Sequence, residues 1–191
     1  MQRRTVIGLS ILAALGVLGV IVVKNREAIA SGLVDLTYTP PPEAGPFLAT
    51  IKAAADQSGV PWQLIARQIQ EESHFDPNIV ASDGGSGLMQ LTPRYYQGID
   101  LFDPESNINA GVSTDAGNYN KYGNWAKTLA AYNAGDGTVD KGIAAATAAG
   151  APENWLLYLP QSPAKARVTR RYVGQILTDV PLESLPNGAF T

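Results

Sequence analysis

The clearest amphipathic pattern in the chain begins at Trp62. Apolar residues recur three and four positions apart, as on one face of a helix: Trp62, Ile65, Ala66 and Ile69. The next position on that face is Glu72, so a carboxylate ends an apolar stripe. The helical pattern stops at residues 75–77 (Phe-Asp-Pro), and a glycine-rich turn over residues 82–87 leads into residues 88–90 (Leu-Met-Gln). Such a turn can fold a second segment back over the acid.

The same periodicity predicts helices on both sides of this segment. Residues 47–58 form an apolar stripe before Gly59, which suits the left-handed position after a helix, and Pro61 fits the first turn of the next helix. Further helices are expected from Ser106 or Asn107 to Gly123, from Asn124 as cap to Gly135, over residues 138–149, and from Ser162-Pro163 with Val168, Thr169, Tyr172, Val173, Ile176 and Leu177 on one side.

Strand signals are weak. Residues 92–105 are rich in Pro, Asp and Tyr and are typical of irregular structure. A short hairpin between Ala81 and Leu91 is the one β element that the pattern allows, because no run of alternating apolar and polar residues is sustained. We therefore predict a mainly α domain over residues 47–180, followed by a surface tail over residues 181–191.

An uncharged apolar run of nineteen residues covers positions 5–23. As a helix it reaches about 28 Å, close to the hydrocarbon thickness of a bilayer. We predict that residues 1–30 form a retained membrane anchor, with the N-terminus inside because Arg3 and Arg4 precede the run. The alternative is a cleaved signal peptide ending at residues 28–30 (Ala-Ile-Ala), which the length of the run disfavours. Residues 31–46 are proline-rich and predict an extended linker, with a reach of at most about 50 Å.

Composition narrows the function classes. The 191 residues suffice for one globular domain plus an appendage. With a formal charge of -3, the chain lacks the positive electrostatic field that nucleic-acid binding needs. The absence of cysteine excludes disulfides, thiolate catalysis and zinc sites built from cysteine. His74 is the only histidine, so we expect no metal and no cofactor. The basic cluster Lys165, Arg167, Arg170 and Arg171 is interpreted as a solvated helix face, with contact to anionic peptide stems or phospholipid as the alternative.

Glu72 alone has two interpretations. Together with Glu71 it fits a solvated helix end, while burial against Ile69 would raise its pKa and make it a proton donor near neutral pH. A glycosidase of the usual kind needs a second carboxylate across the scissile bond. The nearest acids in the sequence are better explained as turn residues, since each precedes proline or glycine: Asp76, Asp83 and Asp103.

Three short segments together carry a family resemblance: Glu72-Ser73, residues 87–90 (Gly-Leu-Met-Gln) and residues 131–135 (Ala-Tyr-Asn-Ala-Gly). Their order and spacing resemble the catalytic domain of the soluble lytic transglycosylases, which share a lysozyme-like fold with goose-type lysozymes. The resemblance covers roughly residues 47–179. Further matches are Asn107-Ile108 with Gly111, and residues 169–173 (Thr-Arg-Arg-Tyr-Val). The family commonly has a glutamate before this last motif, where this chain has Val168.

The resemblance implies roles for individual residues. Glu72 matches the catalytic acid/base and Ser73 its companion. The remaining matches are implied to bind substrate: Met89 and Gln90 as the wall of a glycan cleft, Tyr132 and Asn133 near the acid, and Ser82, Gly87, Leu88 and Tyr172 completing the set. The glycine-rich turn is about one residue shorter than the common family form, which affects the register of Ser82.

The implied reaction is cleavage of the MurNAc–GlcNAc bond of peptidoglycan without water, which leaves a 1,6-anhydromuramic end. We expect a domain on the cell-wall side of a membrane, anchored in the lipid bilayer through residues 5–23 and opening the wall locally. The expected setting is a secretion or conjugation apparatus, or a phage virion, with partner proteins of those assemblies. A goose-type hydrolase and a catalytically silent peptidoglycan-binding module are the alternatives.

Overall fold

The computed structural model describes residues 38–178, and within this range the protein is built from helices. The α-helices are α2 (Leu48–Ser58), α3 (Trp62–Ser73), α4 (Pro104–Tyr122), α5 (Trp125–Ala134), α6 (Asp136–Ala148) and α7 (Pro163–Thr178). Short 3-10 helices add η1 (Pro42–Phe47), η2 (Pro93–Tyr95) and η3 (Pro152–Leu157). The predicted mainly α class is confirmed. The short hairpin that the sequence pattern allowed does not form strands, since the segment holds only isolated bridges from Ser86 to Val80 and to Leu91.

The membrane prediction falls outside this range. Residues 5–23 and the predicted tail over residues 181–191 are not among the described residues. Within residues 38–178, no helix combines the length and the apolarity that crossing a bilayer requires.

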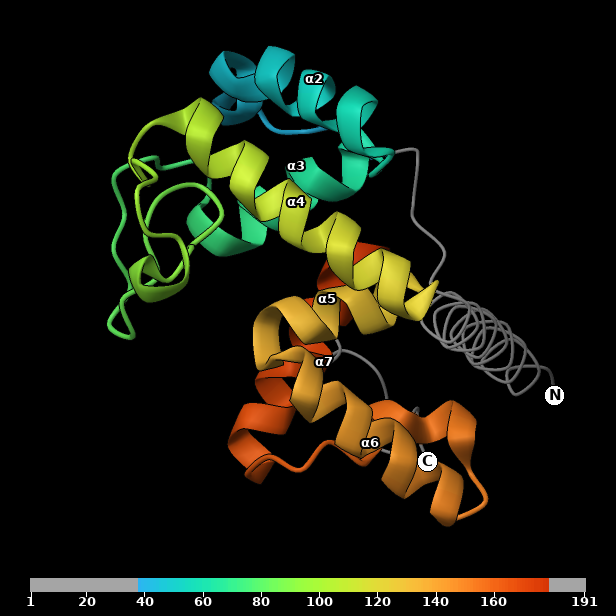
Figure 1. The fold of residues 1–191 in the computed structure, drawn as a ribbon. Helices are drawn as coiled ribbons and strands as arrows, with labels where there is room; N and C mark the ends of the chain where they lie inside the picture. Colours follow the sequence, from blue (N-terminus) through green and yellow to red (C-terminus); the bar gives the residue numbers. More distant parts are fainter. Residues whose placement is uncertain (1–37, 179–191) are drawn as a thin grey trace, which may run out of the picture.

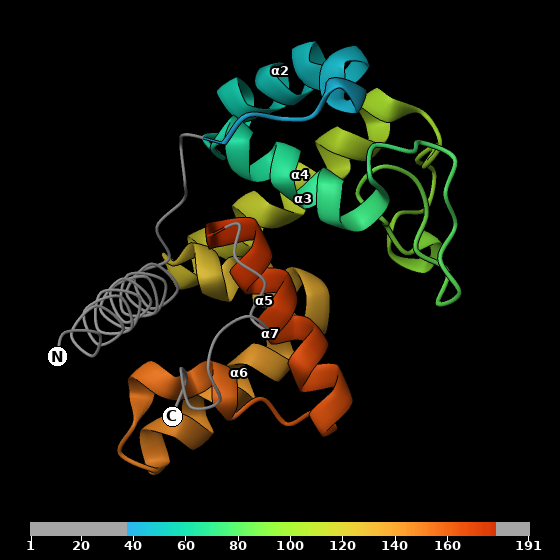
Figure 2. The same ribbon diagram turned by 180° about the vertical axis from the view of Figure 1, so that it is seen from behind.

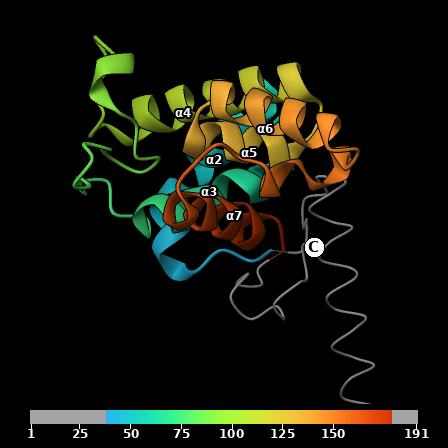
Figure 3. The same cartoon turned by 90° about the horizontal axis from the view of Figure 1, so that it is seen from below.

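Helix α4 links the two ends of the domain (Figure 1). It packs on α2 at one end and on α5 at the other, and α5 in turn contacts α6 and α7. Seen from behind, α7 runs from beneath α3 toward the lower part of the molecule, and the two helices are in contact (Figure 2). The view from below separates α3 and α7 from a second layer that contains α4, α5 and α6 (Figure 3). The long connection between α3 and α4 projects at one end of the molecule beside both layers.

Most helix ends follow local sequence signals. Gly59 adopts φ 76° after α2, and the Asn124 side chain accepts a hydrogen bond from the backbone N–H of Lys127 at 3.1 Å. Helix α4 begins earlier than predicted, because Asp103 is its cap and Pro104 its first residue. Helix α6 also starts at Asp136, two residues before the predicted range.

Two further expectations on packing are corrected. Val168, expected on the apolar side of the last helix, is 59% exposed. It projects away from the domain while the next residue, Thr169, is buried. In the predicted linker over residues 31–46, η1 has formed and Ala44 is fully buried, so the end of that range packs on the domain.

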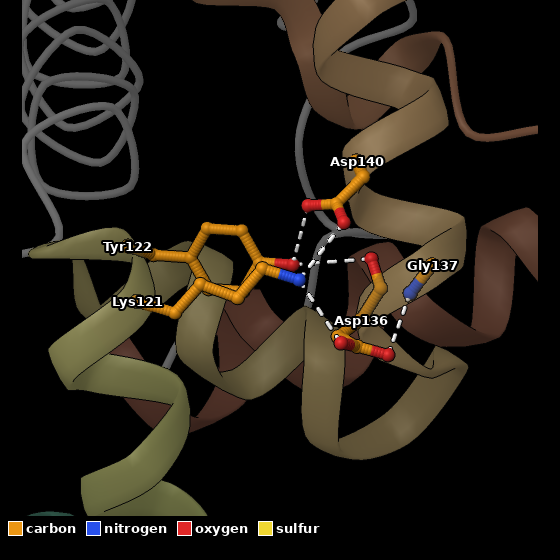
Figure 4. A network of polar contacts seen from close by, with 5 residues as sticks. All are labelled: Lys121, Tyr122, Asp136, Gly137 and Asp140. Atoms are coloured by element: carbon orange, nitrogen blue, oxygen red, sulfur yellow. Dashed lines mark hydrogen bonds and ion pairs between the residues drawn. The ribbon is translucent and has the colours of Figure 1, made fainter.

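A polar network joins the end of α4 to the start of α6 (Figure 4). Lys121 Nζ lies 2.9 Å from Asp136 Oδ2 and 2.8 Å from Asp140 Oδ2, and the Tyr122 hydroxyl donates to Asp140 Oδ1 at 2.9 Å. Burial raises the pKa of Tyr122 to about 12, and the two aspartates raise that of Lys121. Because these groups are solvent-accessible, the network contributes little stability and serves to orient the two helices.

Candidate active site

Glu72 lies on the last turn of α3, where the apolar face of the helix meets a pocket. The preceding residues of that face, Ile65 and Ile69, are fully buried, so the helix holds the base of the Glu72 side chain in the core. The side chain of Glu72 itself is partly buried. From α7, the buried Tyr172 hydroxyl donates a hydrogen bond to Glu72 Oε1 at 2.6 Å. Two adjacent helices therefore fix the position of this carboxyl group.

The surroundings of Glu72 raise its pKa from 4.5 to about 7. Burial is the largest cause, because loss of water disfavours the charged form. The Tyr172 hydrogen bond lowers the pKa, and the negative charges of Asp83 and Glu71 raise it. With a pKa near neutrality, the group can both donate and accept a proton under physiological conditions, as a general acid that later acts as a base must do.

The pocket in front of Glu72 has a volume of about 250 Å³. Its lining comes from α3, from the connection between α3 and α4, and from α5: Glu72, Ala81, Asp83, Gly85, Gln90, Thr92, Tyr132 and Asn133. The structure thus brings together Glu72, Gln90, Tyr132 and Asn133, which the sequence had placed in three separate motifs. Asp83, interpreted as a turn residue, is the second acid of this lining.

Asn107 anchors the turn that forms one wall of the pocket. It is fully buried on α4, and its side chain bonds three backbone groups. Its Oδ1 accepts from Met89 N at 2.8 Å, and its Nδ2 donates to Ser86 O at 3.0 Å and to Leu101 O at 2.9 Å. The turn has isolated bridges but no strand ladder, and the Asn107 bonds add to the backbone pairing that these bridges supply.

Gly87 is required where the turn meets α4. It adopts φ 74°, and a Cβ at this position would overlap Leu101 O and the Asn107 side chain. Gln90, at the other end of the turn, also has a positive φ of 50°. Its side chain turns back to donate to Gly87 O at 2.8 Å. The Gln90 amide is therefore held at the pocket wall by the turn itself.

The residues between Gly87 and Gln90 support the pocket from below. Leu88 and Met89 are fully buried and do not line it. Met89 packs against Gly111 of α4, where an added Cβ would lie 2.8 Å from Met89 Cε. Gly87, Leu88 and Met89, which the resemblance implies to bind substrate, are all buried beneath the pocket wall, and their role in substrate binding stays a prediction.

Helix α5 supplies a further side of the pocket, and α7 supports it from behind the lining. The Tyr132 hydroxyl donates to Met89 O at 2.8 Å, which ties α5 to the turn. Asn133 is exposed, and its Oδ1 accepts from the buried Thr169 hydroxyl at 2.9 Å. Thr169 belongs to the late motif of the sequence, so this motif supports Asn133 while Tyr172 of the same helix supports Glu72.

Other predicted residues lie outside the lining. The buried Ser73 hydroxyl donates to Ile69 O at 3.1 Å within α3, and Ser82 is exposed between the lining residues Ala81 and Asp83. Both serines were implied by the resemblance to bind substrate, and that role stays a prediction. His74 ends α3 with φ 51° and an exposed side chain. Among residues 38–178, no group of three or more His, Cys, Asp or Glu side chains is arranged to hold a metal ion.

Periodicity missed a second buried acid near the site. Asp115 of α4 is fully buried, and its charge interacts with that of Glu72. It lies four residues after Gly111 and eight after Asn107, on the buried face of the same helix. The sequence therefore held the same signal as for Glu72, an acid that continues a buried helical face.

A known protein family matches more than half of the chain. Residues 49–154 match the family model described as "Transglycosylase SLT domain". The chain is 49% identical over 70 residues to a membrane-bound lytic murein transglycosylase F of Desulfosudis oleivorans, which covers 35% of this chain and 15% of that protein. It is 34% identical over 89 residues to a transglycosylase of Enterobacteria phage PRD1, which covers 45% of this chain and 34% of the relative.

A solved structure has a similar fold over part of this chain. The 70 kDa soluble lytic transglycosylase SLT70 of Escherichia coli superposes with a TM-score of 0.53 at 27% sequence identity. The match covers 68% of this chain and 22% of the solved one. This chain thus spans about a third or less of the length of these proteins.

Proposed function

Because the chain belongs to the transglycosylase SLT domain family, we propose that it cleaves the glycan strands of peptidoglycan as a lytic transglycosylase, with Glu72 as its acid and base. The observation that carries the proposal is the carboxyl group of Glu72, with a pKa of about 7, at a pocket shared with Gln90, Tyr132 and Asn133. The amides and the aromatic ring suit N-acetylated sugars, which offer hydrogen-bonding groups and apolar faces.

In the proposed mechanism a single carboxyl group moves one proton twice. Protonated Glu72 donates to the oxygen of the MurNAc–GlcNAc bond as the bond from C1 to that oxygen breaks. The resulting carboxylate then takes the proton from the C6 hydroxyl of the same muramic acid, and that oxygen forms the new bond to C1. The balance closes without water and regenerates protonated Glu72, while the product has a 1,6-anhydro end.

Hydrolysis is the second candidate, because Asp83 lies in the same pocket and could act as the second carboxylate that hydrolases use. The Asp83 carboxylate accepts from the backbone N–H of Gly85 at 3.3 Å, which fits a role in the turn. We therefore place Asp83 in the electrostatic surroundings of Glu72 and assign it no proton transfer.

Product mass separates the two reactions. Digestion of purified peptidoglycan should yield muropeptides that resist borohydride reduction and are lighter, by one water molecule, than the products of a muramidase. Mass spectrometry of the digest measures both properties. If the natural chain produced only reducing ends, and Asp83→Asn abolished that activity, the protein would be a hydrolase.

The pH dependence of activity should follow the groups around Glu72. Protonated Glu72 starts the reaction, so kcat/KM should fall about tenfold per pH unit above about pH 7. Tyr172→Phe removes a hydrogen bond that lowers the Glu72 pKa, and this limb should move to higher pH. Asp83→Asn removes a negative charge that raises the pKa, and the limb should move to lower pH. Shifts of the same sign in both variants would exclude Glu72 as the titrating group.

We further propose that residues 5–23 anchor the protein in a membrane, with the domain on the cell-wall side. The apolar run supports the anchor. The phage origin of one relative supports a virion as the setting, and the relative named as membrane-bound supports a membrane setting. A secretion or conjugation apparatus is the alternative setting for local wall opening. Carbonate washing of membranes should leave the full chain in the pellet, and its release into the supernatant would contradict a spanning anchor.

A further inference from the structure

Asp115 is a buried acid that the proposed mechanism does not use. It lies on α4, fully buried, and its charge interacts with Glu72 of α3, Tyr132 of α5 and Tyr172 of α7. Within residues 38–178, no lysine or arginine forms an ion pair with its carboxyl group. An ionised carboxylate in this position would be buried without a countercharge and beside another acid, which carries a high free-energy cost.

The partner of Asp115 is Gln68, which precedes Glu72 by one helical turn and shares its face of α3. Gln68 is fully buried, and its Nε2 donates to Asp115 Oδ1 at 3.4 Å. Each side chain has one further oxygen, Oε1 of Gln68 and Oδ2 of Asp115, and both are buried without a hydrogen-bond partner.

One proton on the Asp115 carboxyl group would give both of these oxygens a hydrogen-bond partner. Two acceptor oxygens cannot bond each other, and a carboxylate has no hydrogen to give. A proton on Asp115 Oδ2 creates the donor that Gln68 Oε1 lacks, and the amide and the acid then exchange two hydrogen bonds. Burial acts in the same direction, because it raises the pKa of Asp115 well above its ordinary value.

We propose that Asp115 is a neutral carboxylic acid in the native protein, paired with Gln68 by two hydrogen bonds, and that the pair is a positioning device for Glu72. It joins α3 to α4 one turn below Glu72 and leaves no second fixed negative charge there. The positioning role rests on the proposed function of Glu72, whereas the protonation of Asp115 does not.

Infrared spectroscopy tests the protonation directly. The full chain is compared in two forms at pH 7, Glu72→Gln and Glu72→Gln with Asp115→Asn, so that Glu72 contributes no carboxyl signal. We expect the C=O stretch of a protonated carboxylic acid in the first form and its loss in the second. Its absence from the first form would show that Asp115 is ionised and would overturn the proposal, whether or not the protein is a transglycosylase.

Thermal stability tests the protonation state of Asp115 independently. The amide of Asp115→Asn can make both hydrogen bonds of the neutral acid. If the native state keeps a proton that the unfolded state releases, the Tm of the natural chain should fall relative to Asp115→Asn between about pH 5 and pH 8. Parallel Tm curves, or a variant less stable throughout, would contradict a neutral Asp115.

Activity tests the positioning role. Asp115→Leu leaves Gln68 without its partner, and we expect kcat to fall severalfold while Asp115→Asn retains it. The basic limb of the pH profile should stay in place in Asp115→Asn, because no charge is removed. Equal kcat values in the Leu and Asn variants would refute the positioning role. A shift of the basic limb to lower pH in Asp115→Asn would show that Asp115 is an ionised carboxylate in the natural chain. Should the Leu variant fail to fold, the pH profile of Asp115→Asn still decides.

Discussion

Glu72→Gln should lower peptidoglycan lysis by about 10²–10⁴-fold or more, because an amide can neither donate the proton to the glycosidic oxygen nor take one from the C6 hydroxyl. The measurement is turnover of purified peptidoglycan, accompanied by a binding assay on the same material. Binding should persist, since the substitution keeps the size of the side chain and, like the protonated acid, offers one hydrogen-bond acceptor and one donor group. The variant should melt no lower than the natural chain, because it removes a partly buried acid whose pKa folding has raised.

Glu71→Gln is the matched control for this loss. It makes the same chemical change one residue earlier, and Glu71 is not part of the pocket lining. We expect lysis to remain within severalfold of the natural rate. If the natural chain bound peptidoglycan without cleaving it, or if Glu72→Gln lysed the wall as fast as Glu71→Gln, the domain would be a binding module and Glu72 a structural residue.

Asn107→Ala should destabilise the domain by about 3–5 kcal/mol, because three backbone groups would lose their side-chain partner. The cost of a buried unpaired group is about 1–3 kcal/mol, and Asn107 bonds the backbone of Ser86, Met89 and Leu101. Chemical denaturation monitored by circular dichroism gives the free energy of unfolding. Lysis should fall as well, since the turn that these bonds hold carries Gln90 and accepts the Tyr132 hydrogen bond.

Asn109→Ala provides the comparison, because Asn109 is exposed on the same helix two residues later. Its effect should be within about 0.5 kcal/mol, as for most surface substitutions. If the two variants were equally stable, the Asn107 bonds would contribute nothing net, and the turn would have to be held by its other hydrogen bonds and by the packing of Leu88 and Met89.

Helix positions followed well from the sequence where apolar spacing and end signals agreed, as in α2 with Gly59 and in α5 between Asn124 and Gly135. The start of α4 was predicted too late because an Asp-Pro pair such as Asp103-Pro104 is common both in turns and at the N-terminus of a helix. Val168 was placed on the wrong face because its apolar side chain suggested burial. Its position on the helix decides instead: the next residue, Thr169, faces the core, and Val168 is turned away from it.

The sequence predicted which residues belong to the site, but not which of them line the pocket and which support it from the core. The motifs identified Glu72, Gln90, Tyr132 and Asn133, which the fold gathers at one pocket. Whether Met89 faces substrate or core depends on Gly111 of α4, a contact that spacing within the turn cannot reveal. Gln68 and Asp115 are 47 positions apart, so their pairing follows only from the packing of α3 on α4.

The hydrogen bond from Tyr172 to Glu72 joins positions 100 residues apart, which makes it one of the most non-local contacts of the site. Closing so long a loop is entropically costly, so contacts of this kind form late in folding. Helix α7 is also the last of the described helices to leave the ribosome. A nascent or truncated chain that lacks α7 therefore presents Glu72 without its tyrosine and Asn133 without Thr169, and the site becomes complete only when the domain is complete.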